Sequence, residues 1–209
     1  KKADLSLAEV RINSKKSSVL NTLSALDIKL RPVNSSQDIL RIVPGLFIAQ
    51  HAGGGKAEQI FLRGFDIDHG TDIAITVDGL PVNMVSHAHG QGYADLHFLI
   101  PETLEKVTFD KGPYQATKGN LATAAFVDFN TREFLDENML KAEIGRYNTQ
   151  RLAGMIKVLN NSTDEKREQL YLASEYNRTD GYFESPQQFR RFNLMGKYNT
   201  WWGKQTQLI

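Results

Sequence analysis

Hydrophobic and polar residues alternate through the second part of the chain. In residues 140–145 and 192–200 the even positions are mostly apolar and the odd positions mostly polar, and Leu170, Leu172 and Tyr176 continue the pattern. A period of two places alternate side chains on opposite faces of a strand. Polar runs at 160–167 and 179–188 interrupt the alternation, so the sequence predicts long antiparallel strands joined by turns. Both a water-exposed sheet and a membrane barrel fit this pattern.

The first part of the chain reads as mixed α and β structure. Ser35 or Ser36 can cap a short helix over residues 37–43, which Pro44 and Gly45 stop. A second helical turn can begin at Pro101, because proline suits the first helical position. Short strands separated by Gly and Asp turns are expected at 46–50, 59–62, 73–77, 106–109 and 125–129.

Composition excludes several classes of protein. The 209 residues carry 25 Lys and Arg against 24 Asp and Glu and contain no cysteine. Disulfide scaffolds, thiolate metal sites and cysteine nucleophiles are therefore excluded, and the balanced charge gives no case for nucleic-acid binding. No apolar run approaches the roughly 18 residues of a membrane helix, and the first residues do not resemble a signal peptide.

Two glycine-rich segments carry candidate chemistry. Lys56 follows three glycines (Gly53, Gly54 and Gly55), but Ala57 stands where a phosphate-binding loop needs Ser or Thr. A flexible loop is the better interpretation. The segment 86–97 contains His87, His89, Asp95 and His97, which are suited to zinc or copper but can equally hydrogen-bond their own backbone. A soluble metal-binding protein or a metal-dependent enzyme built on His87, His89 and Asp95 is one hypothesis.

Four motifs in order resemble the plug domain of TonB-dependent outer-membrane receptors. Residues 36–46 are similar to its helix followed by Pro-Gly, and residues 60–66 to its Leu-Arg-Gly-Phe strand. Residues 75–83, which read Ile-Thr-Val-Asp-Gly-Leu-Pro-Val-Asn, match the Val-Asp-Gly-x-Pro-Val element, and residues 104–113 resemble the run that ends in Lys-Gly-Pro. Together the motifs cover residues 35 to 131.

The resemblance implies an α+β plug, with a small mixed sheet and short helices, followed by the start of an antiparallel transmembrane β-barrel. The expected ranges are a tail at 1–34, a plug at 35–131 and barrel strands at 132–209. At about 9 to 11 residues per strand, the last range holds three or four strands, too few to close a barrel. The side chains expected to face the lumen are Lys141, Glu143, Asn193 and Lys197, and those expected to face lipid are Leu140, Ile144, Leu194 and Tyr198.

The resemblance also implies partners and a location. It implies uptake of a scarce extracellular ligand (siderophore iron, haem or a metal) across the bacterial outer membrane, without catalysis or a resident cofactor. The partners would be the TonB energy-transducing protein, the ligand and outer-membrane lipid, with the plug reaching the periplasm. The candidate TonB box consists of Leu7, Ala8, Glu9, Val10, Arg11 and Ile12. The plug loops expected to face the ligand contain Gly53, Gly54, Gly55, Lys56, His87, His89 and Tyr93.

If the histidine-rich segment holds a metal ion, the isolated plug will bind zinc through imidazole nitrogens. The double substitution of His87→Ala and His89→Ala will then abolish binding in a calorimetric titration. Absence of any heat of binding at micromolar zinc would contradict the metal hypothesis.

Overall fold

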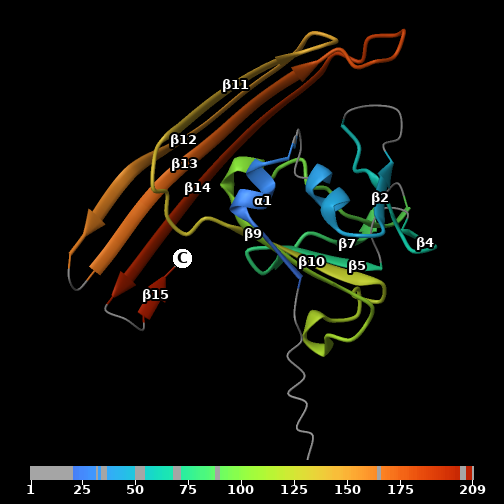
Figure 1. Cartoon of the computed structure of the whole chain (residues 1–209), viewed down its shortest axis with the longest axis horizontal. Helices are drawn as coiled ribbons and strands as arrows, with labels where there is room; N and C mark the ends of the chain where they lie inside the picture. Colours follow the sequence, from blue (N-terminus) through green and yellow to red (C-terminus); the bar gives the residue numbers. More distant parts are fainter. Residues whose placement is uncertain are drawn as a thin grey trace, which may run out of the picture.

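The computed structural model describes residues 21–31, 33, 37–49, 55–67, 72–87, 90–163, 166–202 and 206–208. A compact α+β plug, formed by residues up to Thr131, lies against a curved wall of long strands (Figure 1). The candidate TonB box at 7–12 lies outside the described residues.

A five-stranded sheet forms the centre of the plug, in the order β1-β9-β10-β5-β6. Its strands are β1 (Asn21–Ser24), β5 (Ile73–Val77), β6 (Leu80–Pro81), β9 (Leu104–Lys111) and β10 (Ala125–Thr131). β10 pairs with β5 in parallel, whereas the other pairs are antiparallel. Parallel pairing of neighbours needs a long crossover, here residues 78–124.

Smaller elements surround this sheet. β2 (Leu46–Ala49), β3 (Gln59–Leu62) and β4 (Phe65–Ile67) form a three-stranded sheet, and β7 (Met84–His87) and β8 (Gly90–Tyr93) form a hairpin. The helical elements are α1 (Ala25–Lys29) and the 3-10 helices η1 (Gln37–Ile42), η2 (Pro101–Thr103) and η3 (Ala116–Lys118). One apolar cluster joins η1, both sheets and the segment after β8 through Ile39, Leu62, Ile75, Leu96 and Phe129.

The predicted elements of the plug are confirmed with altered details. The helix expected over 37–43 is present as a 3-10 helix, and the turn at Pro101 is η2. The strands at 46–50, 59–62, 73–77 and 125–129 are β2, β3, β5 and β10, while the strand expected at 106–109 extends to Leu104–Lys111.

Residues 21–29 add two plug elements inside the range that the sequence assigned to a tail. β1 pairs with β9, and Leu23 packs against the plug core. α1 follows at once because Ser24 and Asp27 form a capping box, in which each side chain bonds the other's backbone amide. β1 gives no alternation signal because Leu23 is its single apolar residue, so the pattern alone did not reveal it.

The wall is an antiparallel sheet in the order β11-β12-β13-β14-β15, and it does not close. Its strands are β11 (Met139–Gly145), β12 (Thr149–Ser162), β13 (Lys166–Thr179), β14 (Phe189–Trp202) and β15 (Thr206–Leu208). Leu140, Ile144 and Leu194 are strongly exposed on the face away from the plug, and Tyr198 is partly exposed. The polar side chains expected to face the lumen lie on the side of the plug. Lys141 bonds Glu143 and Glu102, Asn193 bonds the His97 backbone oxygen, and Lys197 bonds Asp78. The predicted division of faces is therefore confirmed. Among the described helices, none has the length and apolar character to cross a membrane.

Asp78 ties the plug's central sheet to the wall. Asp78 and Gly79 form the two-residue turn between β5 and β6, both with positive φ (49° and 81°), as a type I′ turn requires. The Asp78 carboxylate accepts bonds from the Thr131 amide (2.8 Å) and hydroxyl (2.5 Å). Lys197 on β14 donates its ammonium to Asp78 (3.1 Å) and to the Thr131 hydroxyl (2.8 Å).

Replacing Asp78 with Ala should destabilise the end of β10 by about 3 kcal/mol, because it removes three bonds and leaves the buried Lys197 ammonium without its carboxylate. Native-state hydrogen exchange of the β10 amides measures this change. The same substitution at the exposed Asp136 is the control. Equal exchange in the two variants would show that Asp78 does not hold the two parts together.

Candidate functional site

A cluster of ionised side chains joins the plug to the wall around Arg151 on β12. The Arg151 side chain is only 3% exposed and contacts three carboxylates. It binds Glu102 of η2 through both terminal nitrogens (Nη1 2.7 Å, Nη2 2.6 Å), Glu175 of β13 through Nε and Nη2 (2.8 and 2.6 Å), and Glu143 of β11 through Nη1 (2.8 Å). Glu102 is the plug's contribution, so this guanidinium bridges the two parts of the molecule.

The cluster extends in both directions along the wall. Arg191 on β14 binds the other oxygen of the fully buried Glu175 through Nε (3.0 Å) and Nη2 (2.7 Å). Lys141 on β11 binds Glu102 (3.2 Å) and Glu143 (3.0 Å). Asn193 reaches back to the plug, donating its amide to the backbone oxygen of His97 (2.7 Å). Lys141, Arg151 and Arg191 thus balance Glu102, Glu143 and Glu175 in charge.

Glu102 is ionised in this setting. Burial alone would raise the pKa of its carboxyl, but the bonds and charge of Arg151, together with Lys141, lower the pKa below its ordinary value of 4.5. A buried carboxylate is stable only where such partners compensate its lost hydration. The plug therefore meets the wall through this charge cluster, beside an apolar cluster in which Ile100 of the plug packs with Met155 and Tyr171 of the wall.

The linker between plug and wall, residues 132–138, is held along its backbone by side chains of the wall. Four wall side chains donate hydrogen bonds to main-chain carbonyl oxygens of the linker. The side-chain oxygen of Gln169 also accepts a hydrogen bond from the Leu135 amide (2.5 Å). The carbonyl contacts are Tyr171 Oη to Arg132 (2.8 Å), Asn199 Nδ2 to Glu133 (2.5 Å), Gln169 Nε2 to Leu135 (3.1 Å) and Lys157 Nζ to Asp136 (2.8 Å). Arg167 lies over the Phe134 ring, 3.9 Å from its centroid.

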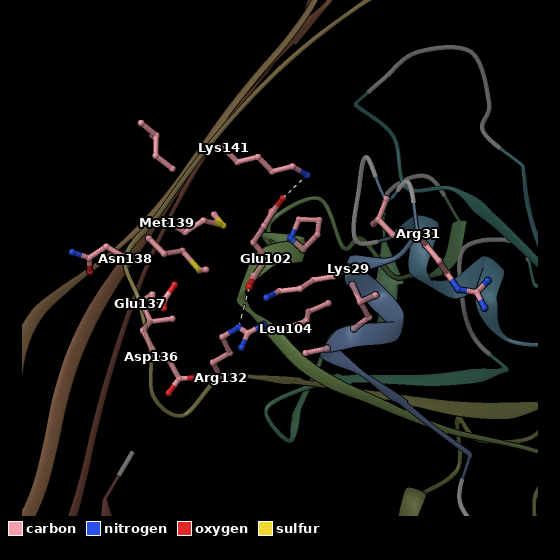
Figure 2. Close-up of a pocket in the computed structure, with 17 residues that line it drawn as sticks. Lys29, Arg31, Glu102, Leu104, Arg132, Asp136, Glu137, Asn138, Met139 and Lys141 are labelled. Carbon is pink, nitrogen blue, oxygen red and sulfur yellow. Dashed lines mark hydrogen bonds and ion pairs between the residues drawn. The ribbon is translucent and has the colours of Figure 1, made fainter.

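A cavity of about 720 Å³ separates α1 from the linker and β11. Figure 2 shows Lys29 extending from α1 toward it, with Glu102 bonded to Lys141 on one side and Arg132 donating to the Glu102 backbone oxygen on another. The lining mixes aliphatic and charged groups from both parts of the molecule. The bonds from Lys141 and Arg132 to Glu102, which join wall and linker to the plug here, lie at the edge of the cavity.

The structure brings the two predicted ligand-facing loops together where they are described. The Ala57 amide, next to Lys56, donates to the Tyr93 hydroxyl (2.9 Å), and the Tyr93 ring stacks on His87 with centroids 4.3 Å apart. Gly55 and Lys56 are exposed. Gly53, Gly54 and His89 lie outside the described residues.

The other members of the proposed metal set form a separate pair. His97 contacts the Asp95 carboxylate through its ring Nδ1 (2.6 Å) and donates its backbone amide to the same oxygen (2.7 Å). Within the part of the chain that the structure describes, no three His, Asp or Glu side chains gather as a metal site. Because His89 lies outside the described residues, the zinc site stays a prediction.

The sequence did not point to the Arg151 cluster as a site. Alternation predicts that Lys141 and Glu143 face inward, and the register that sets Glu143 opposite Arg151 follows from the turn at 146–148. Glu102 lies 49 residues before Arg151, and nothing in the local pattern brings the two together.

A plug packed inside a curved antiparallel wall defines the class of plugged outer-membrane receptors. The sequence matches the TonB-dependent receptor plug domain over residues 13–126, more than half of the chain, and the chain belongs to this family.

Solved structures of whole receptors share the fold. The siderophore receptor PirA from Pseudomonas aeruginosa is 21% identical, with 90% of this chain and 33% of that one covered and a TM-score of 0.57. The ferric enterobactin receptor PfeA from the same organism, solved as a mutant with enterobactin bound, is 19% identical over 79% of this chain and 26% of its own (TM-score 0.56). The copper transporter OprC is 18% identical over 88% and 28% (TM-score 0.60). The chain thus spans about a quarter to a third of these receptors.

Replacing Glu102 with Gln should weaken the attachment of the plug by about 2 kcal/mol at pH 7, because Arg151 loses its plug partner. The lowered pKa of Glu102 means that its stabilisation is complete above about pH 4.5 and is lost as the pH falls through the folded-state pKa. Opening of the η2 amides, measured by hydrogen exchange corrected for the intrinsic exchange rate, should therefore increase in acid in the wild type and change less in the variant. Glu137→Gln, at an exposed residue, is the control, and identical acid profiles for Glu102→Gln and wild type would refute the assignment.

Proposed function

We propose that this chain is part of a receptor that takes up a scarce extracellular ligand across the bacterial outer membrane with energy from the TonB complex. The observation that carries the proposal is the polar attachment of plug to wall through Glu102, Arg151 and Lys197. Bonds between charged groups can be replaced by bonds to water, so these polar attachments can be broken without leaving their charges unsolvated.

The position of β1 supports energy input through the tail. Among the described residues, β1 is a four-residue edge strand that pairs only with β9. In the sequence it directly follows residues 1–20, which contain the candidate TonB box at 7–12. A pull on the tail would act first on this short strand. The alternating Val10 and Ile12 suit pairing of the tail with a strand of a periplasmic partner.

The two faces of the wall support placement in the outer membrane. The outward apolar side chains Leu140, Ile144, Leu152 and Ile156 would contact lipid, while the charged cluster lies inside with the plug. The loops joined by Ala57 and Tyr93 would then face the exterior and contact the ligand. The siderophore and copper receptors of similar fold favour a metal or a metal complex as that ligand.

Deleting residues 7–12 from the complete receptor should abolish uptake and leave binding of ligand at the cell surface unchanged, because the deletion removes only the coupling strand. Radiolabelled ferric siderophore, measured on cells and in spheroplasts, separates the two steps. Deletion of residues 1–6 shortens the tail equally and is the control. Undiminished uptake without residues 7–12 would refute the assignment of the box.

A further inference from the structure

Glu58 is a buried carboxyl that none of the contacts between plug and wall uses. It lies between Ala57, which is tethered to Tyr93, and the first residue of β3, and it is only 8% exposed. Its Oε2 atom is inaccessible to solvent and has no hydrogen-bond partner in the described structure. An unpaired carboxylate at such a position would carry a large desolvation cost.

The surroundings of Glu58 are nearly all aliphatic. Glu58 shares a small cavity with Gln37 of η1, whose buried Oε1 also has no hydrogen-bond partner among the described residues, and the cavity has no room for a water molecule. The strands β2, β3 and β5 face the cavity with Ile48, Ile60 and Ile75. Neither water nor an adjacent cation in this cavity compensates a charge on Glu58.

Charged groups near Glu58 come from two elements. Asp38 and Arg41 lie on η1, and Asp95 and His97 lie on the segment after β8. The two carboxylates disfavour a charge on Glu58 and the two basic side chains favour it, so they oppose one another. Burial is the largest effect, and the pKa of Glu58 lies above its ordinary value of 4.5.

We propose that Glu58 is a proton-operated switch of the plug, neutral while it is buried within the layer of η1, β2 and β3, and ionised when this layer opens to water. The carboxyl proton leaves to solvent on opening and is taken up again on closing. Gln37 lines the same cavity, and its buried Oε1 has no hydrogen-bond partner among the described residues. The switch is a property of the folded plug and does not depend on the ligand or on TonB.

The direction of the pH effect follows from proton binding. The closed form holds a proton that the open form releases above about pH 4.5, so rising pH favours opening. Between this value and the raised pKa of the closed form, the opening equilibrium increases about tenfold per pH unit. Above that pKa the effect is constant. Raising the pH towards this raised pKa therefore loosens the layer of η1, β2 and β3, and lowering the pH closes it.

The test is hydrogen exchange of the complete receptor in detergent across pH 5 to 9, corrected for the intrinsic exchange rate. Peptides covering β2 and β3 should show opening that increases with pH relative to the β10 peptide of the same molecule. Glu58→Gln, which is neutral at every pH, should abolish the increase and be better protected at alkaline pH, whereas Glu105→Gln, at an exposed residue of β9, should behave as wild type. Because no transport is measured, failure of the uptake proposal would leave this result unaffected.

Two outcomes would overturn the proposal. The first is that, in the wild type, the ratio of the opening equilibria of the β3 and β10 peptides does not change with pH. This result needs no variant, so it would contradict the proposal even if Glu58→Gln does not fold. The other is opening that responds at fixed pH to sodium in place of choline, which would assign the two buried oxygens to a metal ion rather than to a proton.

Discussion

The Arg151 guanidinium is the interaction on which the arrangement of plug and wall depends. Placing this charge where only 3% of it is exposed costs hydration, and the structure offsets that cost with hydrogen bonds to three carboxylates from β11, β13 and η2. Two of the three belong to the wall, so Arg151 stays paired when Glu102 leaves. Glu102 can therefore separate from the wall without leaving the Arg151 guanidinium unpaired, which an exclusive pair with Glu102 would not permit.

The linker is attached mainly through its backbone rather than through ionised side chains. Wall side chains bind the backbone oxygens of Arg132, Glu133, Leu135 and Asp136, and Tyr171 and Met155 pack around Leu135 in an apolar cluster. These contacts are spread over several strands and include buried apolar surface, so they must all be broken together to release the linker. The linker is accordingly the stronger attachment, and Glu102 and Lys197 mark the attachments that exchange more readily.

Local patterns predicted the strands and their faces but not the contacts that join distant segments. The runs at 73–77 and 125–129 could be read as strands, yet their parallel pairing depends on how the intervening residues return. Likewise, alternation placed Glu143 and Lys197 inward, whereas their partners Arg151 and Asp78 follow from strand register and from a turn far away in sequence. β1 escaped prediction because a strand with one apolar residue is stabilised by its neighbour β9 rather than by its own pattern.

Glu58 and Glu102 show how one plug uses two carboxyls in opposite ways. Cations around Glu102 lower the pKa of its carboxyl, while burial among aliphatic side chains raises the pKa of Glu58. Acid therefore loosens the attachment of the plug to the wall and tightens the layer of η1, β2 and β3, whereas raising the pH above about 4.5 loosens that layer and leaves the Glu102 attachment unchanged. The pH of the surrounding medium thus affects which part of the plug yields first, and the order of opening is a consequence of where the two side chains are buried.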